Sequence, residues 1–301
     1  MIKAIDLTKQ FDGVTAVDRL TLDIESGEVF GFLGPNGAGK TTTVRMLTSL
    51  IAPSDGTAVV AGYPLGEADE EIRRHVGILT ESPGLYERLT AERNLQIYGR
   101  LYEVEDVEGQ VERYLRLLGL WERRKDPAGT FSKGMKQKLA IARALLHEPS
   151  VLFLDEPTVG LDPEAAKLVR DFVSELRTQG RTIFLCTHNL DEAERLCDRI
   201  AVFNQSLRVV DTPSGLRRQM YGRQVVFHLS DRPEPYVAML KRLDFVREAE
   251  AIENKLLVSL DDPEVHNPEL IRLLVETGAQ IQFVGELRHS LEDVYLRLVH
   301  G

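Results

Sequence analysis

The stretch Gly34-Pro-Asn-Gly-Ala-Gly-Lys-Thr41 has the residue types and the spacing of the phosphate-binding pattern G-x-x-x-x-G-K-[ST]. Its three glycines let the backbone bend so that N–H groups converge on phosphate oxygens. Lys40 supplies a positive charge for the β- and γ-phosphates of a nucleotide, and the Thr41 hydroxyl suits Mg²⁺. The residues that we expect to contact a nucleotide here are Gly34, Pro35, Asn36, Gly37, Ala38, Gly39, Lys40, Thr41 and Thr42.

The flanking sequence favours a phosphate site over the alternative, a glycine-rich turn with a chance lysine. Residues 28–33 have the pattern of a strand, and residues 41–48 have that of a helix. This strand–loop–helix context is what the motif requires. The positive end of the helix dipole would add to the attraction for phosphate.

Two adjacent acids, Asp155 and Glu156, follow the apolar run 151–154. Carboxylates at a buried strand end are costly unless a cation or a reaction uses them. We expect Asp155 to hold Mg²⁺ through water, and Glu156 to act as general base toward the attacking water. The alternative is a strand end with two solvated acids, but that alternative leaves the phosphate-binding loop unexplained.

The segment 131–137 begins an amphipathic helix that could form a second anion site. Ser132 stands where an N-cap belongs, and Gly134 permits close approach to the backbone. The alternative is a plain N-capped core helix. Apolar residues at spacings of three and four then share one face of this helix: Met135, Leu139, Ala142 and Leu146.

The order of the elements predicts an α/β fold. Residues 2–24 alternate as half-buried antiparallel strands do, whereas the later apolar runs suit a parallel sheet covered by helices. Ligands of such sheets bind beyond the carboxyl ends of the strands, where the acids lie. The block at about 87–147 is almost entirely helical and predicts a subdomain inserted into the core. The runs assigned to the parallel sheet are 29–33, 76–79, 151–154, 183–186 and 200–203.

A change of composition near residues 205–222, with the helix breaker Thr212-Pro-Ser-Gly215, divides the chain into domains 1–215 and 220–301. The second domain has a β-α-β-β-α-β pattern followed by a helix, which resembles a small ferredoxin-like α+β unit. Its expected elements are strands 223–229, 246–250, 255–260 and 280–284, and helices 233–242, 267–277 and 289–299.

Composition narrows the function classes. The chain has 301 residues, and 37 Lys and Arg against 47 Asp and Glu give a net charge of −10. That charge disfavours non-specific binding to nucleic acid or anionic lipid, so no nucleic-acid partner is expected. No apolar stretch approaches the roughly 20 residues of a membrane-spanning helix. Two cysteines without metal-ligand spacing suggest free thiols in a reducing compartment.

Together these motifs resemble the ATP-binding subunit of an ABC transporter. Ser132-Lys-Gly-Met-Lys-Gln137 stands in place of that family's commoner Ser-Gly-Gly-Gln. The resemblance implies ATP and Mg²⁺ as ligands and a head-to-tail dimer, formed with a second copy or a paralogous subunit. In that dimer Ser132 and Gly134 would contact the γ-phosphate bound to the other subunit. Asp162, in Val159-Gly-Leu-Asp162, would contact the partner near its phosphate-binding loop and also cap a helix.

The resemblance assigns four further residues. His188 matches the histidine that contacts the γ-phosphate and helps to position Glu156 and water, although a lone histidine can be structural. Phe11 matches the aromatic that stacks on adenine, with Val17 beside the ring, although core packing is the alternative. One position departs from the family pattern, because Glu81 replaces the usual glutamine that meets Mg²⁺ and the membrane partner.

The resemblance implies an ATP-hydrolysing motor on the cytoplasmic face of the cell membrane, which would drive export through a separate integral-membrane subunit. Residues 82–103 would contact that subunit. The tail resembles the C-terminal extension of type-2 bacterial exporters and ends in Ser290-Leu-Glu-Asp-Val-Tyr295. Alternatives are a soluble ABC ATPase acting on ribosomes or DNA, and a regulator that binds ATP without turnover. The chain lacks the second motif set, or the inserted coiled coil or zinc module, that the first alternative would require. The catalytic residues that it retains argue against the second: Lys40, Asp155, Glu156 and His188.

Overall fold

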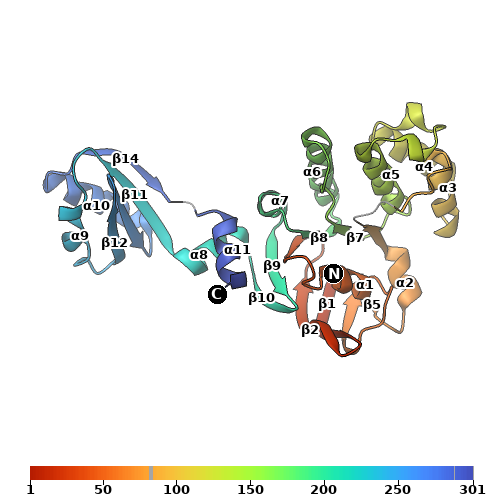
Figure 1. The fold of residues 1–301 in the computed structure, drawn as a ribbon, viewed down its shortest axis with the longest axis horizontal. Helices are drawn as coiled ribbons and strands as arrows, with labels where there is room; N and C mark the ends of the chain where they lie inside the picture. The colour runs from red at the N-terminus through yellow and green to blue at the C-terminus, as the bar shows by residue number, and fades with distance from the viewer. Residues whose placement is uncertain (81–83, 288, 301) are drawn as a thin grey trace. The chain divides into compact units, whose positions relative to one another are not determined.

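The computed structural model describes residues 1–80, 84–287 and 289–300. The chain forms two compact units that divide between Thr212 and Pro213 (Figure 1). The larger unit contains the phosphate-binding loop and every other predicted nucleotide contact. Each unit has its own apolar core.

A six-stranded sheet forms the centre of the larger unit. The inner strands β3, β8 and β7 are buried on both faces. Neighbouring strands pair in parallel except β10, which pairs antiparallel with β9. Phe32, Phe153 and Phe184 are fully buried within it. In spatial order the strands are β10 (Ser206–Asp211), β9 (Arg199–Asn204), β3 (Val29–Leu33), β8 (Thr182–Thr187), β7 (Val151–Asp155) and β6 (Val76–Leu79).

A four-stranded antiparallel sheet lies on the other side of helix α1 (Lys40–Leu47), and one hydrophobic core joins all three layers. Val44, Met46 and Leu47 of α1 contribute to this core. The helix that carries Lys40 and Thr41 is therefore clamped between two sheets. The antiparallel strands, in spatial order, are β2 (Val14–Ile24), β1 (Ile2–Phe11), β4 (Asp55–Val60) and β5 (Tyr63–Pro64), and α2 (Asp69–His75) precedes β6.

A cluster of helices lies between β6 and β7 in sequence and forms the helical subdomain (Figure 1). Each of its three α-helices begins at a side chain that accepts a hydrogen bond from the first turn: Thr90, Asp106 and Ser132. The helices are α3 (Ala91–Leu101), α4 (Val107–Leu117) and α5 (Lys133–Leu145), with 3₁₀ turns at Trp121–Arg123 and Ala128–Thr130. The helices that follow β7 and β8 are α6 (Pro163–Thr178) and α7 (Leu190–Leu196).

The smaller unit has the strand order β12-β13-β11-β14, with every neighbouring pair antiparallel. This is the ferredoxin-like arrangement expected from the β-α-β-β-α-β pattern. The segment at 212–215 was expected only to break the chain, but Pro213 is the first residue of a helix, a position that proline tolerates. The elements are α8 (Pro213–Tyr221), β11 (Arg223–Leu229), α9 (Glu234–Leu240), β12 (Val246–Ile252), β13 (Lys255–Leu260), α10 (Pro263–Glu276), β14 (Ile281–Glu286) and α11 (Leu291–His300).

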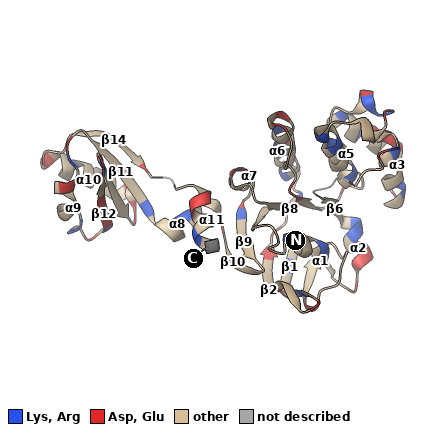
Figure 2. Ribbon diagram, viewed as in Figure 1, with Lys and Arg blue, Asp and Glu red and all other residues tan. Residues whose placement is uncertain are grey.

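Charged residues of both signs are spread over the helices, whereas the central strand β8 carries none (Figure 2). Among the described residues, every helix is too short or too polar to span a bilayer.

Candidate functional site

The phosphate-binding loop connects β3 to α1, and its backbone leaves no space for side chains at two glycines. Gly39 has a φ of 102°, and a Cβ there would lie 2.3 Å from the carbonyl oxygen of Ala16. A Cβ on Gly34 would lie 2.2 Å from the carbonyl oxygen of Phe203. The loop is therefore pressed against β2 and the end of β9, and only glycine fits at these two positions.

The side chain of Lys40 is buried beneath this loop. Its Nζ donates to the carbonyl oxygen of Gly34 at 2.7 Å and to that of Pro35 at 3.3 Å. The same ammonium lies 3.9 Å from Oε1 of Glu156. Lys40 therefore places one positive charge between the loop and the acidic end of β7.

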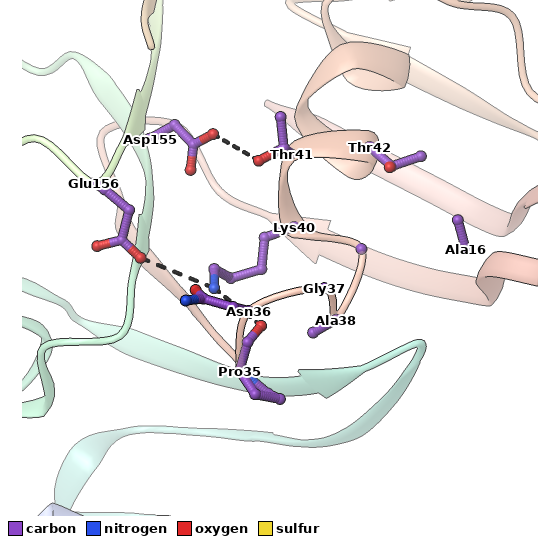
Figure 3. A pocket seen from close by; sticks show the side chains of 11 residues that line it. Ala16, Pro35, Asn36, Gly37, Ala38, Lys40, Thr41, Thr42, Asp155 and Glu156 are labelled. Atoms are coloured by element: carbon purple, nitrogen blue, oxygen red, sulfur yellow. Dashed lines mark hydrogen bonds and ion pairs between the residues drawn. The ribbon is translucent and has the colours of Figure 1, made fainter. Parts of the chain in front are cut away.

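Thr41 and Asp155 bring the loop and the acidic strand end into contact. The Thr41 hydroxyl donates to Oδ2 of Asp155 at 2.8 Å (Figure 3). A pocket of about 210 Å³ opens beside this pair. A hydroxyl and a carboxylate oxygen are hard ligands of the kind that Mg²⁺ takes from P-loop proteins, with phosphate and water completing its shell. The pocket is lined by Ala16, Pro35, Asn36, Gly37, Ala38, Gly39, Lys40, Thr41, Thr42, Asp155 and Glu156.

Glu156 has a left-handed backbone with a φ of 51°, which is uncommon outside glycine and tends to occur at functional sites. Its N–H donates to the carbonyl oxygen of Cys186 at 2.9 Å, which fixes the turn to β8. Its Oε1 lies 2.8 Å from Nδ1 of His188. Its Oε2 is buried and has no hydrogen-bond partner among the described residues. The structure thus brings together both predicted hydrolytic residues, although 32 positions separate them.

The residues expected to act on a partner's nucleotide lie apart from this pocket. Ser132 caps α5 by accepting from the N–H of Met135 at 3.2 Å. Asp162 caps α6 by accepting from the N–H of Ala165 at 2.8 Å. A Cβ on Gly134 would lie 3.1 Å from Cβ of Ala165, so the two helix starts are packed together. Neither helix start lines the pocket of its own chain.

Of the adenine-binding candidates, Phe11 is at the end of β1 with 47% of its side chain exposed. Val17 is fully buried, and its Cγ2 lies 3.3 Å from the place of a Cβ on Gly39. Ala16 lines the pocket, and no sequence pattern predicts this because a lone alanine in a strand has no distinguishing chemistry. The position of Glu81 falls outside the described residues.

Gln137 joins two elements of the site, and the sequence did not predict this contact. Its side chain is buried, and its Nε2 donates to the carbonyl oxygen of Pro157 at 2.8 Å. This bond connects α5 directly to the loop that follows Glu156. Gln137 is part of the motif that begins at Ser132. Its contact could not be predicted, because the fold brings together two residues that are 20 positions apart in sequence.

A phosphate-binding loop clamped between two sheets, facing the acidic end of a neighbouring parallel strand, defines a P-loop nucleotide hydrolase with an inserted helical subdomain. The sequence profile described as "ABC transporter" matches residues 17–159. The profile "ATP-binding protein DrrA1-3-like, C-terminal domain" matches residues 212–299.

Relatives match over nearly the whole chain. The bacitracin transport ATP-binding protein BcrA of Bacillus licheniformis is 35% identical, covering 100% of this chain and 98% of its own length. The daunorubicin resistance ATP-binding protein DrrA2 of Streptomyces coeruleorubidus is 34% identical, with 99% and 94% covered. A solved structure titled as the ATP-binding subunit of an ABC transporter is 33% identical, with a TM-score of 0.68 and 74% and 94% covered.

The chain therefore belongs to the ABC transporter family of ATP-binding proteins. It is an ATPase of that family, and its C-terminal domain matches the DrrA1-3-like profile. The alternatives of a ribosome- or DNA-directed ATPase and of a regulator without turnover are set aside.

Proposed function

We propose that this subunit works on the cytoplasmic face of a membrane as one of two ATPase subunits, and that it powers export through a separate integral-membrane protein. Two observations support export. The names of the two relatives given above denote bacitracin transport and daunorubicin resistance, and both relatives match from end to end. The C-terminal unit matches the profile of the DrrA1-3-like C-terminal domain, which bears the name of the second relative, DrrA2.

The observation that carries the proposed mechanism is the convergence of Lys40, Thr41, Asp155 and Glu156 on one pocket. The loop N–H groups and the α1 dipole would hold the phosphates of ATP, and Lys40 would neutralise charge on the β- and γ-phosphates. Mg²⁺, held by Thr41 and Asp155, would stabilise the negative charge that develops on the transferred phosphate. Glu81 stays a prediction as a further ligand.

Glu156 would act as general base and orient the attacking water, with His188 holding its carboxylate. An ionised carboxylate can only accept, so the 2.8 Å contact requires the proton to be on Nδ1 of the imidazole. This leaves Oε2 of Glu156, which lacks a partner among the described residues, to accept from water. Water would attack the γ-phosphorus in line, so that its oxygen–phosphorus bond forms while the bond to the leaving oxygen of ADP breaks, and the water proton would pass to Glu156.

The second half of the catalytic site would come from another subunit. Ser132 and Asp162 present two neighbouring helix N-termini, which are anion sites, yet they do not line the pocket of their own chain. A head-to-tail pair would place these helix starts over the γ-phosphate of the other subunit. ATP would then join the two subunits, and hydrolysis would remove the contacts that hold them together.

The test compares the wild type with Glu156→Gln in the purified full chain. We expect ATP turnover to fall about 10²–10⁴-fold, the usual contribution of a general base. ATP binding should persist, and ATP should convert the variant from monomer to dimer in sedimentation velocity. Lys40→Ala should lose both ATP binding and dimerisation. A Glu156→Gln variant with full turnover, or wild-type monomers that hydrolyse ATP without ever pairing, would refute the proposal.

For the C-terminal unit we propose a role in dimerisation or regulation, because it has its own core and a distinct profile match. Removal of residues 213–301 should leave ATP binding intact, since every pocket residue lies in the larger unit. Assembly or transport should change in cells that express the membrane partner. If the ATPase rate, assembly and transport were all unaltered, this role would be excluded.

A further inference from the structure

A buried carboxyl group, Glu192, lies in the first turn of α7, four residues after His188. Only 2% of the residue is exposed, although glutamate is seldom buried without a purpose. Its Oε1 is buried and has no hydrogen-bond partner in the part of the chain that the structure describes. No sequence motif singles out this residue, and the proposed mechanism does not use it.

The other oxygen of Glu192 joins two loops. Oε2 accepts from the hydroxyl of Thr158 at 3.1 Å and from the hydroxyl of Thr187 at 3.2 Å. Thr158 is two residues beyond Glu156, and Thr187 directly precedes His188. The carboxyl group therefore binds the loops on both sides of the Glu156–His188 contact.

The bonding around Glu192 extends into the backbone of the histidine loop. The Thr187 hydroxyl also accepts from the N–H of Asn189 at 3.0 Å. The Asn189 side chain in turn caps α7, because its Oδ1 accepts from the N–H of Glu192 at 3.1 Å. His188 is thus flanked on both sides by residues that Glu192 holds. Its own side chain is 58% exposed, so packing alone holds it only loosely.

We propose that Glu192 is a positioning residue for ATP hydrolysis, which fixes the loop of Glu156 and the loop of His188 relative to each other. This inference rests on the proposed function of Glu156 and His188. The two loops are also joined by two other hydrogen bonds. The N–H of Glu156 donates to the carbonyl oxygen of Cys186 at 2.9 Å, and Nδ1 of His188 lies 2.8 Å from Oε1 of Glu156. Loss of the third link would let the base and the histidine drift apart.

The role needs an acceptor at Oε2 and no negative charge. Burial raises the pKa of Glu192, and this outweighs the hydrogen bonds from Thr158 and Thr187 and the positive charge of Arg170, which lower it. A glutamine has the same shape and keeps one carbonyl oxygen for both threonine hydroxyls. Glu192→Gln should therefore retain the wild-type rate of ATP turnover, whereas Glu192→Ala should not.

The experiment measures kcat, KM and ATP affinity for Glu192→Ala, Glu192→Gln and the control Asp191→Ala in the full chain. Asp191 is the exposed neighbour in the same helical turn. We expect kcat to fall about 100-fold in Glu192→Ala, the size of effect that a 1 Å misplacement produces. KM and ATP affinity should stay at the wild-type level, and both Glu192→Gln and Asp191→Ala should turn over normally.

If Glu192→Ala fails to fold, variants of the two threonines that bind Glu192 test the inference. Thr158→Val and Thr187→Val each remove one hydroxyl and keep the side-chain volume. We expect each to lower kcat without lowering ATP affinity, and the double variant to be less than additive, since both act through the same carboxyl. Independent, fully additive effects, or normal turnover in both, would overturn the inference.

Two other results would also overturn the inference. Full turnover by a folded Glu192→Ala would remove the positioning role. An equal loss in Glu192→Gln would mean that the charge matters rather than the hydrogen bonds. Glu156→Gln is assayed alongside: if it retains full turnover, the proposed function fails, whereas a slow Glu156→Gln beside a fast Glu192→Ala rejects the positioning role alone.

Discussion

The Thr41 hydroxyl donates a 2.8 Å hydrogen bond to Asp155, a residue 114 positions away in sequence. This contact joins the start of α1 to the end of β7 and places two oxygen ligands beside the pocket. Because β7 and β3 are separated by β8 in the sheet, the contact depends on the strand order as well as on the two motifs. It is the geometric basis for the proposed Mg²⁺ site.

The first prediction concerns this pair. Thr41→Val and Asp155→Asn should each lower Mg²⁺-dependent ATP turnover by about 10²-fold or more, since they weaken electrostatic stabilisation of the transition state. Thr41→Ser keeps the hydroxyl and should stay near the wild-type rate. The measurement is turnover across a Mg²⁺ titration, and removal of the metal with a chelator should stop turnover of the wild type. Equal rates for Thr41→Val and Thr41→Ser would contradict the assignment.

The second prediction compares two glycines with similar backbones. Gly37 and Gly39 both have positive φ, 79° and 102°, but a Cβ on Gly37 meets nothing within 4 Å, whereas one on Gly39 meets the Ala16 carbonyl oxygen. Gly37→Ala should cost about 1 kcal/mol from the left-handed backbone alone. Gly39→Ala should cost more than about 2 kcal/mol and abolish ATP binding. Thermal unfolding and ATP titration measure both, and similar losses in the two variants would count against the geometry.

The third prediction tests Phe11 as the adenine platform. Phe11→Ala should weaken ATP binding by about tenfold, because stacking of a base on an aromatic ring contributes about 1–3 kcal/mol. Binding of inorganic tripolyphosphate, which has no base, should not change. Val14→Ala is the matched control, since Val14 pairs with Phe11 in the hairpin and is 66% exposed. Equal weakening of both ligands would exclude stacking on adenine.

The fourth prediction concerns His147, which follows α5. Its Nε2 donates to the carbonyl oxygen of Val76 at 3.0 Å, and its ring stacks on Tyr102 with the centroids 3.9 Å apart. Burial lowers the pKa of His147 from 6.5 to about 4. The unfolded chain therefore binds a proton near pH 6.5, while the folded chain does so only near pH 4. Its contribution to stability is fully present above pH 6.5 and is lost as the pH falls toward 4.

The size of this loss can reach about 3 kcal/mol at 1.36 kcal/mol per pKa unit. Urea unfolding followed by the fluorescence of Trp121, the single tryptophan, reports on the unit that contains His147. The free energy of unfolding should fall between pH 6.5 and 4 in the wild type and fall less in His147→Gln. A slope that is the same in both proteins would assign the acid sensitivity to other groups.

Much of the fold was predictable because its signals are local. Apolar runs predicted the strands β3, β6, β7, β8 and β9 but not β4 and β5, and capping side chains such as Ser132 and Asp162 marked helix starts that the structure has. The smaller unit was also predictable, since alternation and helical periodicity fixed its order of elements. The helix α8 was missed because Pro213 and Gly215 are usual breakers, and only its position at the helix start makes proline acceptable.

The nucleotide site divides in the same way. The phosphate-binding loop and the two acids could be predicted from sequence, because a glycine-rich turn and a strand end fix the position of such residues, and His188 could be predicted from the resemblance to the family. Ala16, Gln137 and Glu192 could not be found, because each acquires its role from a neighbour supplied by another element. The roles of the individual site residues stay predictions until the variants are measured.

The sequence by itself determined which chemistry this protein can perform, since that chemistry depends on residue types at short, fixed spacings. Tertiary structure alone decided that Val17 is buried while Ala16 lines the pocket, and that Glu156 takes a left-handed turn within reach of His188. It also decided that one buried carboxyl joins two loops. These features arise from packing between elements distant in sequence, which short-range patterns do not encode.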